Sequence, residues 1–269
     1  MLSYRKYADF TSAMCLIVFA YRCHPDYPLI LLANRDEFYA RPTRAMQFWP
    51  EQPDLLAGKD LQAGGTWMGI NTQGRFAAIT NYRQGKATSI EGYSRGQLPG
   101  DFLTGSQNCT DYLTQLQTTA HHFPGYNLLL GDTYGLYYHS NQNSAIKQLT
   151  PGVYGLSNAL LDTPWPKLEL AKQRFAELLN QKLLDSDLLL NLMTDRHQPD
   201  PGLLPDTGVG AELEHLLAPV FIQSELYGTR STSLLVQHTS GHTDLYEKTY
   251  PAASYDEPVH FTLQVPPLG

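Results

Sequence analysis

The chain has 269 residues, of which 42% are hydrophobic and 17% are charged, and its formal net charge at pH 7 is −7. This length suffices for one large domain or two small ones with an ample core. The acidic balance argues against a nucleic-acid partner, because nucleic-acid-binding domains usually carry a basic surface. No apolar run reaches the ~18–20 residues that a membrane-spanning helix needs, so no membrane span is predicted.

The cysteines and the first residues bear on compartment and processing. Cys15, Cys23 and Cys109 are an odd number without metal-ligand spacing. This favours free thiols in a reducing compartment, and we predict a cytoplasmic protein. Residues 1–13 lack the apolar core of a signal peptide. We interpret them as a leader before a natural start at Met14, so that removal of the methionine would expose Cys15.

The first two apolar runs predict a β-hairpin, because they are separated by turn-forming proline and aspartate. If Arg22 pairs with Pro28, counting along the ladder places Cys15 opposite Arg35. Directly opposed residues lie on the same face of a sheet. We therefore expect the thiol of Cys15, the guanidinium of Arg35 and the carboxylate of Asp36 to meet at one end of a sheet.

Two short β-type runs between residues 64 and 83 predict a second hairpin around the turn signal Asn-Thr-Gln-Gly at 71–74. If Asn71 pairs with Gly74, Asn81 falls opposite Gly64. A glycine there leaves space in which a ligand or another backbone can approach, and the alternative is a plain bulge.

The remaining chain predicts strands that alternate with two blocks of helix. Residues 41–50 are interpreted as a connecting segment because of their prolines. Helical periodicity is present at 109–122, 162–179, 186–194 and 211–217. Further strands are predicted at 126–132, 135–139, 153–158, 234–237, 242–248 and 259–265. This order favours a layered α+β architecture over βαβ alternation, and we predict one domain over residues 14–269.

The candidate chemistry lies at strand ends. Cysteine is the best nucleophile there, and a neighbouring arginine stabilises its thiolate. If Cys15 is N-terminal, its own α-amine, whose pKa is ordinarily about 7.7–8.0, can accept the thiol proton. The structural alternative is that Cys15 is a small core residue and that residues 34–37 are a charged strand end. The nine histidines are scattered, so neither a metal site nor a cofactor is predicted.

Seven motifs stand in order along the chain: Met14-Cys15, Asn34-Arg35-Asp36-Glu37, Gly64-Gly65-Thr66-Trp67-Met68-Gly69, Thr80-Asn81-Tyr82-Arg83, Gly155-Leu156-Ser157-Asn158, Asp162-Thr163-Pro164-Trp165-Pro166-Lys167 and Tyr227-Gly228-Thr229-Arg230. Together they resemble the NRDE family, also called the transport-and-Golgi-organisation family. That family is similar to the N-terminal-nucleophile hydrolases, in the branch of choloylglycine hydrolase and penicillin acylase. The resemblance implies a four-layer αββα sandwich of two antiparallel sheets.

The resemblance also implies a role for individual residues. Cys15 matches the nucleophile exposed by processing, Arg35 the arginine beside it, and Asp36 the carboxylate that holds the α-amine. In those hydrolases the arginine and the aspartate are two residues apart, whereas here they adjoin. Asn34 and Glu37 are therefore alternative candidates for the carboxylate position.

The later motifs supply the rest of the implied site. Asn81 and Asn158 match the asparagines that stabilise the oxyanion, and Arg230 matches a distal arginine. Trp67 and Tyr82, together with Asn34 and Glu37, are expected to contact the substrate.

The implied function is that of an amidohydrolase or acyltransferase-like enzyme in which Cys15 attacks a small-molecule amide or ester. Members of the family are also associated with haem trafficking and with lipid or acyl-CoA homeostasis, so the alternative is a non-catalytic carrier of haem or acyl-CoA. A scaffold for membrane traffic is the third class. A hydrolase needs the free amine of Cys15, whereas a carrier or a scaffold does not.

Overall fold

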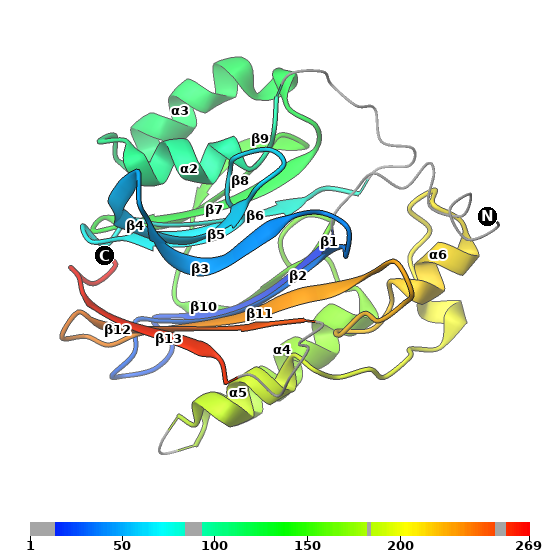
Figure 1. Cartoon of the computed structure of the whole chain (residues 1–269). Coiled ribbons are helices and arrows are strands. Elements are labelled where there is room, and N and C mark those ends of the chain that lie inside the picture. The colour runs from blue at the N-terminus through cyan, green and yellow to red at the C-terminus, as the bar shows by residue number, and fades with distance from the viewer. Residues whose placement is uncertain (1–13, 84–92, 182–183, 251–256) are drawn as a thin grey trace.

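The computed structural model describes most of the chain as two antiparallel sheets stacked face to face, with helices on both outer sides (Figure 1). The predicted α+β, four-layer αββα sandwich is confirmed. The described residues are 14–83, 93–181, 184–250 and 257–269. The predicted leader at 1–13 lies outside them.

The first sheet has six strands in the order β10-β1-β2-β11-β12-β13. Their bounds are β1 (Met14–Tyr21), β2 (Leu29–Phe38), β10 (Gly152–Leu156), β11 (Tyr227–Gln237), β12 (His242–Thr249) and β13 (Val259–Gln264). The second sheet has seven strands in sequence order. They are β3 (Thr43–Trp49), β4 (Gln52–Asp60), β5 (Met68–Asn71), β6 (Phe76–Asn81), β7 (Tyr126–Asp132), β8 (Gly135–Ser140) and β9 (Asn143–Gln148).

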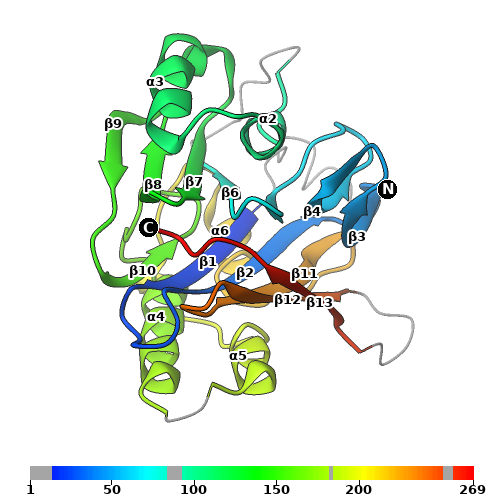
Figure 2. The same cartoon turned by 90° about the vertical axis from the view of Figure 1, so that its left-hand side faces the viewer.

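The outer helices divide between the two sheets (Figures 1 and 2). The second sheet is covered by α2 (Gln97–Thr104) and α3 (Cys109–Thr119), and the first by α4 (Pro166–Leu179) and α5 (Ser186–Leu192), while α6 (Ala211–Leu216) lies to one side. Asn108 caps α3 by accepting a hydrogen bond from the backbone N–H of Asp111. Within the described residues, no helix combines the length and apolarity needed to cross a membrane.

Residue alternation along β1 and β2 builds the layers. Ile17 and Phe19 belong to the core between the sheets, whereas Leu16 and Val18 belong to the core beneath α4 and α5. Because side chains alternate across a strand, both faces of these central strands are apolar. A slip of one residue would exchange the two faces, so the alternation also fixes which polar residues at the strand ends face which layer.

The predicted register of the first hairpin is confirmed. The backbone N–H of Arg22 donates to Pro28 O at 2.8 Å, and Cys15 pairs with Arg35. On its other side β1 pairs with β10, with Ile17 opposite Leu156. Counting two residues further places residue 158 level with Cys15. The start of β1 is therefore flanked by an arginine on one side and an asparagine on the other.

The second hairpin forms with its turn at 71–74, where Gly74 has φ +79°. Its predicted register is wrong by one residue. The backbone N–H of Asn71 donates to Arg75 O, because the Asn71 side chain accepts from the amides of the turn and draws in one more residue. Continuing the observed register, the position level with Asn81 is Gly65 rather than Gly64.

Gly65 provides the close backbone approach that was expected one residue earlier. A Cβ built on Gly65 would lie 2.3 Å from the carbonyl carbon and oxygen of Gly96. The backbone N–H of Thr66 also donates to Gly96 O at 3.0 Å. The segment that leads into α2 is therefore fixed against the start of β5.

The interpretation of residues 41–50 as a connecting segment is wrong, since β3 and β4 form a third hairpin in the second sheet. Pro42 precedes β3 and Pro50 follows it, so both prolines bound the strand rather than interrupt it. This hairpin brings residues 41 and 60 to the same end of the sandwich as Cys15.

We expect Gly65→Ala to lower the free energy of unfolding by about 1–3 kcal/mol, because the new methyl overlaps the Gly96 backbone. Gly100→Ala is the matched control, since a Cβ there meets nothing within 4 Å and the residue lies inside α2. That control should be stabilised by about 0.5–1 kcal/mol. Urea unfolding of the two variants checks both values, and equal effects would contradict the packing described here.

Candidate active site

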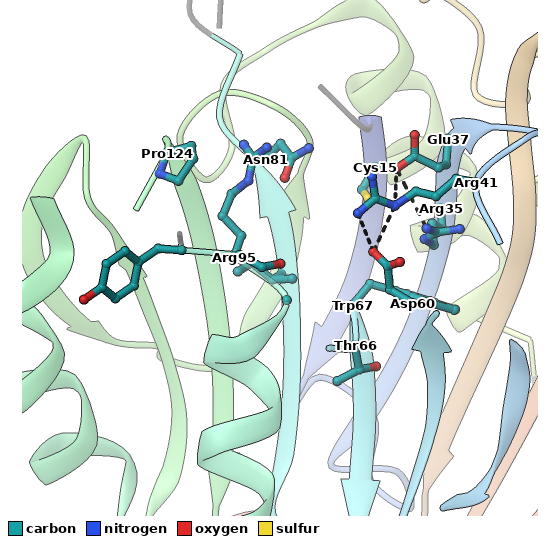
Figure 3. A pocket seen from close by; sticks show the side chains of 14 residues that line it. Cys15, Arg35, Glu37, Arg41, Asp60, Thr66, Trp67, Asn81, Arg95 and Pro124 are labelled. Atoms are coloured by element: carbon teal, nitrogen blue, oxygen red, sulfur yellow. Dashed lines mark hydrogen bonds and ion pairs between the residues drawn. The ribbon is translucent and has the colours of Figure 1, made fainter. Parts of the chain in front are cut away.

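A pocket of about 160 Å³ opens at the end of the sandwich where β1 begins (Figure 3). Its lining combines Cys15 with five charged side chains and comes from both sheets and from the segment before α2. The lining residues are Cys15, Arg35, Glu37, Arg41, Asp60, Thr66, Trp67, Ile79, Asn81, Tyr93, Ser94, Arg95, Gly96 and Pro124. This volume is well above the ~10–15 Å³ that a single water needs, and it suits a small polar group.

Cys15 is the nucleophile candidate in this lining, and only 7% of its surface is exposed. Burial raises the pKa of Cys15 to about 12, the charge of Asp36 adds to the rise, and Arg35 opposes it. With the preceding residue still attached through the peptide bond, the thiol is therefore neutral at pH 7. Its activation requires a base or an added positive charge.

Arg35 lies opposite Cys15, and its side chain is ordered by two neighbours. Its guanidinium stacks on the ring of Trp67 at 4.3 Å, and its Nη2 lies 3.8 Å from Glu37 Oε2. The indole of Trp67 occupies space that only a glycine at 58 leaves, since a Cβ there would lie 2.2 Å from the ring. The structure thus places predicted residues Arg35, Glu37 and Trp67 together around Cys15.

Arg41 and Asp60 extend this charged lining. Arg41 donates to Asp60 Oδ2 from Nη2 at 2.7 Å and from Nε at 2.9 Å, and its Nε lies 3.6 Å from Glu37 Oε2. Burial and the bond to Arg41 act in opposite directions on the pKa of Asp60, and the net effect lowers it. The sequence analysis missed both residues, because it assigned Arg41 to a connecting segment and predicted no element around Asp60.

The two predicted oxyanion asparagines have different positions. Asn81 lines the pocket. Asn158 is fully buried, and its Nδ2 donates to the backbone oxygen of Asn81 at 2.8 Å. Beside it, Ser157 Oγ donates to Cys15 O at 3.1 Å. Asn158 therefore joins β10 to the end of β6 and holds Asn81, rather than lining the pocket itself.

Asp36 was expected to meet Cys15 and Arg35 at one end of the sheet. It lies at that end, but strand alternation turns its side chain away from the pocket and toward the helix layer. Its Oδ1 accepts from Thr229 Oγ1 at 2.6 Å, whereas its buried Oδ2 has no hydrogen-bond partner among the described residues. Burial raises the pKa of Asp36 to about 6, and Lys167 is the main group that opposes the rise. In register, Asp36 lies opposite Met14, directly before Cys15.

Lys167 is a buried cation that sequence reasoning left out of the site. Its Nζ donates to Leu217 O at 2.9 Å, and burial lowers the pKa of Lys167 to about 8, while Asp36 acts in the opposite direction. Lys167 ends the motif 162–167, and this position was the feature of the sequence that could have indicated a role in the site. The apolar periodicity of the following helix instead suggested a purely structural role.

A buried ion pair lies near this lysine. Arg83 Nη1 is 2.6 Å from Glu214 Oε2, and its guanidinium stacks on the Trp165 ring at 4.6 Å. The charges of Lys167, Asp36, Arg83 and Glu214 therefore lie behind β1 and β2. Buried charges are tolerated only with such partners.

Three further predicted residues lie away from the pocket. Asn34 faces the helices, and its amide donates to Met193 O and Val220 O at 2.8 and 2.9 Å, so it has a structural role. Arg230 lies at a bulge in β11 and donates to the backbone oxygens of residues 38, 39 and 41. It fixes the loop that carries Arg41. Tyr82 follows β6 and does not line this pocket.

Among the described residues, no group of three or more His, Cys, Asp or Glu side chains is arranged to hold a metal ion. The three cysteines are unpaired.

The family model for Transport and Golgi organisation 2 matches residues 14–252. The chain belongs to this family. A Mus musculus protein named "Transport and Golgi organization 2 homolog" is 35% identical over 257 residues, covering 88% of this chain and 93% of the relative. The Homo sapiens homologue has the same identity and coverage. The resemblance in the seven motifs is thereby confirmed, and the matched region begins at Met14.

Among solved structures, penicillin V acylase from Agrobacterium tumefaciens aligns with a TM-score of 0.40 and 10% identity, covering 93% of this chain and 86% of that chain. Similarity at this level carries no argument about activity. The site has to be judged from its own residues.

We expect Lys167→Met to lower the free energy of unfolding by about 3–5 kcal/mol at pH 8, because it leaves Asp36 charged and buried without its cation. The loss should be smaller at pH 5. The folded-state pKa of Asp36 is already raised and would rise further in the variant. Protonation of the folded state therefore restores stability as the pH falls through that value.

Lys172→Met on the same helix is the matched control. Lys172 pairs with Asp162 at the surface, so its loss should cost about 0–1 kcal/mol at either pH. Urea unfolding at pH 5 and pH 8 measures both variants. A cost of Lys167→Met that does not change with pH would contradict the coupling to Asp36.

Proposed function

We propose that the protein is an N-terminal-nucleophile hydrolase in which Cys15 cleaves a small-molecule amide or ester. The observation that carries the proposal is the arrangement around the start of β1. Cys15 faces the pocket beside Arg35, while an oxygen of Asp36 that has no hydrogen-bond partner among the described residues lies buried behind the same residue pair. A purely structural cysteine does not need an arginine opposite it and an unsatisfied carboxylate at its amino side.

The active form in this proposal begins at Cys15. Met14 lies opposite Asp36 in the ladder, so cleavage after Met14 creates an α-amine close to that carboxylate. Asp36 Oδ2 is the acceptor that this amine would use. Satisfying a buried carboxylate oxygen with a charge-assisted hydrogen bond stabilises the processed chain. A free α-amine ordinarily has a pKa of about 7.7–8.0, which suits a base that works at neutral pH.

The mechanism follows from these positions. The α-amine of Cys15 takes the thiol proton, and Sγ attacks the substrate carbonyl carbon. The tetrahedral intermediate collapses as the C–N or C–O bond breaks, and the proton passes from the α-amine to the leaving group. The resulting thioester is attacked by water, whose proton returns through the same amine, and release of the acid restores the thiol.

The other groups act on charge and position. Asn81 in the pocket is the donor for the oxyanion, held by the hydrogen bond from Asn158 to its backbone. Arg35 favours the thiolate, since its charge lowers the pKa of Cys15. The guanidinium of Arg35 is held in place by the carboxylate of Glu37 and by stacking on the ring of Trp67.

A carrier of haem or acyl-CoA is the alternative, and the site supports it less well. No histidine lines the Cys15 pocket, as far as the described residues define it, and its walls combine five charged side chains with a few apolar ones. A carrier also has no use for a cysteine paired with an arginine. The free cysteines fit a hydrolase that works in a reducing compartment such as the cytoplasm.

We expect Cys15→Ala to abolish turnover of any amide or ester substrate while the free energy of unfolding changes by less than about 2 kcal/mol, because a small side chain replaces a small side chain. Steady-state kinetics together with urea unfolding measure the two effects. Turnover that survives in Cys15→Ala would remove Cys15 as the nucleophile.

Asn81→Ala should lower kcat by about 10²–10³-fold with a smaller change in KM, the usual consequence of losing one oxyanion donor. Tyr82→Phe, at the neighbouring position outside the pocket lining, is the control and should leave kcat within about 3-fold. Equal effects of the two substitutions would argue against an oxyanion role for Asn81.

A further inference from the structure

The Cys15 pocket holds one more cation than its carboxylates neutralise. Its lining contains the guanidinium groups of Arg35, Arg41 and Arg95 and the carboxylates of Glu37 and Asp60. Asp60 binds Arg41 through two hydrogen bonds, and Glu37 lies between Arg35 and Arg41. Within the described part of the chain, no carboxylate lies within ion-pair distance of Arg95.

Arg95 is nevertheless held in a defined position. Its Nη1 donates to Gly125 O at 3.0 Å, and the next residue, Gly96, is fixed by the hydrogen bond from Thr66 and the close contact with Gly65. Two residues before it, the ring of Tyr93 packs against Phe123 at 5.2 Å. In Figure 3 the Arg95 side chain extends from this segment toward Asn81 at the pocket wall.

Most of the N–H donors of the Arg95 side chain have no acceptor among the described residues. A guanidinium has five N–H donors, and among the described residues one carbonyl accepts from a single donor. Burial lowers the pKa of Arg95 to about 10, and the nearby carboxylate of Glu37 opposes that shift. A partly desolvated cation with such donors gains most from an anionic partner that enters the pocket.

We propose that Arg95 binds a carboxylate on the substrate, so that the preferred substrates are N-acyl amino acids or similar amides that carry an acid group close to the scissile bond. The inference rests on the proposed hydrolase function of this site. A planar carboxylate matches the guanidinium fork, and the small pocket volume suits a compact headgroup beside Cys15 and Asn81. The acyl chain then extends toward the opening.

Calorimetric titration of the full-length protein tests binding without requiring turnover. N-acetylglycine and the neutral N-acetylethanolamine have similar size and differ in the acid group. We expect N-acetylglycine to bind about 10-fold more tightly or better, and Arg95→Gln to abolish that preference. Arg95→Lys should recover only part of it, because lysine keeps the charge but lacks the fork.

Arg44→Gln is the matched control, since Arg44 is exposed on β3 and does not line the pocket. It should retain the preference for N-acetylglycine. Inorganic phosphate is titrated in parallel as a competing anion. Phosphate binding more tightly than N-acetylglycine would overturn the carboxylate assignment, as would an Arg95→Gln variant that still prefers N-acetylglycine.

Kinetics separate this inference from the proposed function. With N-acylglycines, Arg95→Gln should lower kcat/KM by about 10- to 100-fold, and with N-acylethanolamines by less than about 3-fold. Turnover that requires Cys15 but is lowered equally for both amides would overturn the role of Arg95 and leave the hydrolase intact. Carboxylate binding lost in Arg95→Gln, without any turnover by the form that begins at Cys15, would overturn the hydrolase and leave the anion site.

Discussion

Strict alternation at the ends of β1 and β2 is the constraint on which the site depends. Cys15, Arg35 and Glu37 face the pocket because the apolar residues of the same parity face the other sheet. Asn34 and Asp36 necessarily face the helices. The thiol and the carboxylate behind it are thus separated by the thickness of a strand, and only the backbone at the start of β1 is close to both.

That separation gives the backbone nitrogen of Cys15 its importance. On the pocket side, burial and the negative charge of Asp36 raise the pKa of the thiol. On the helix side, Asp36 has an oxygen without a partner among the described residues and a buried lysine nearby. A positive charge created at that nitrogen would lower the pKa of the thiol and satisfy the carboxylate together. A single proteolytic step would therefore change the electrostatics of both faces.

The buried charges behind the strands are costly, and an apolar replacement of similar shape could be as stable. Arg83 pairs with Glu214, and the charge of Asp36 acts on Lys167. The motif that supplies Arg83 also supplies Asn81 in the pocket. This arrangement is understandable if the helix layer serves to set the charge at the start of β1. Asn158, which follows β10, holds the backbone of Asn81 through its own hydrogen bond.

Much of the fold could be predicted from the sequence because it follows from local rules. The pairing of Cys15 with Arg35 could be counted from a turn, and the layers followed from the order of hairpins and helices. The second hairpin was displaced by one residue because a side chain in the turn accepts backbone hydrogen bonds. Asp36 does lie at the predicted end of the sheet, but strand alternation turns its side chain away from the thiol and toward the helices.

The parts of the site that could not be predicted are long-range. Arg95 reaches the pocket because two glycine backbones touch, and Lys167 comes near Asp36, behind the pocket, because α4 packs beneath β1. Neither contact leaves a periodic pattern in the sequence. Arg230 resembled a catalytic residue, but it orders a loop, a distinction that requires coordinates.

The most direct test of the central claim is mass spectrometry of two forms of the protein after reaction with a β-lactone, an electrophile that acylates nucleophilic thiols. One form begins at Cys15 and the other retains residues 1–14. We expect one acyl group on Cys15 in the first form and none on Cys15 in the second, because only the first has the α-amine that activates the thiol. Equal labelling of both forms, or no labelling of the form that begins at Cys15, would contradict catalysis by an N-terminal cysteine.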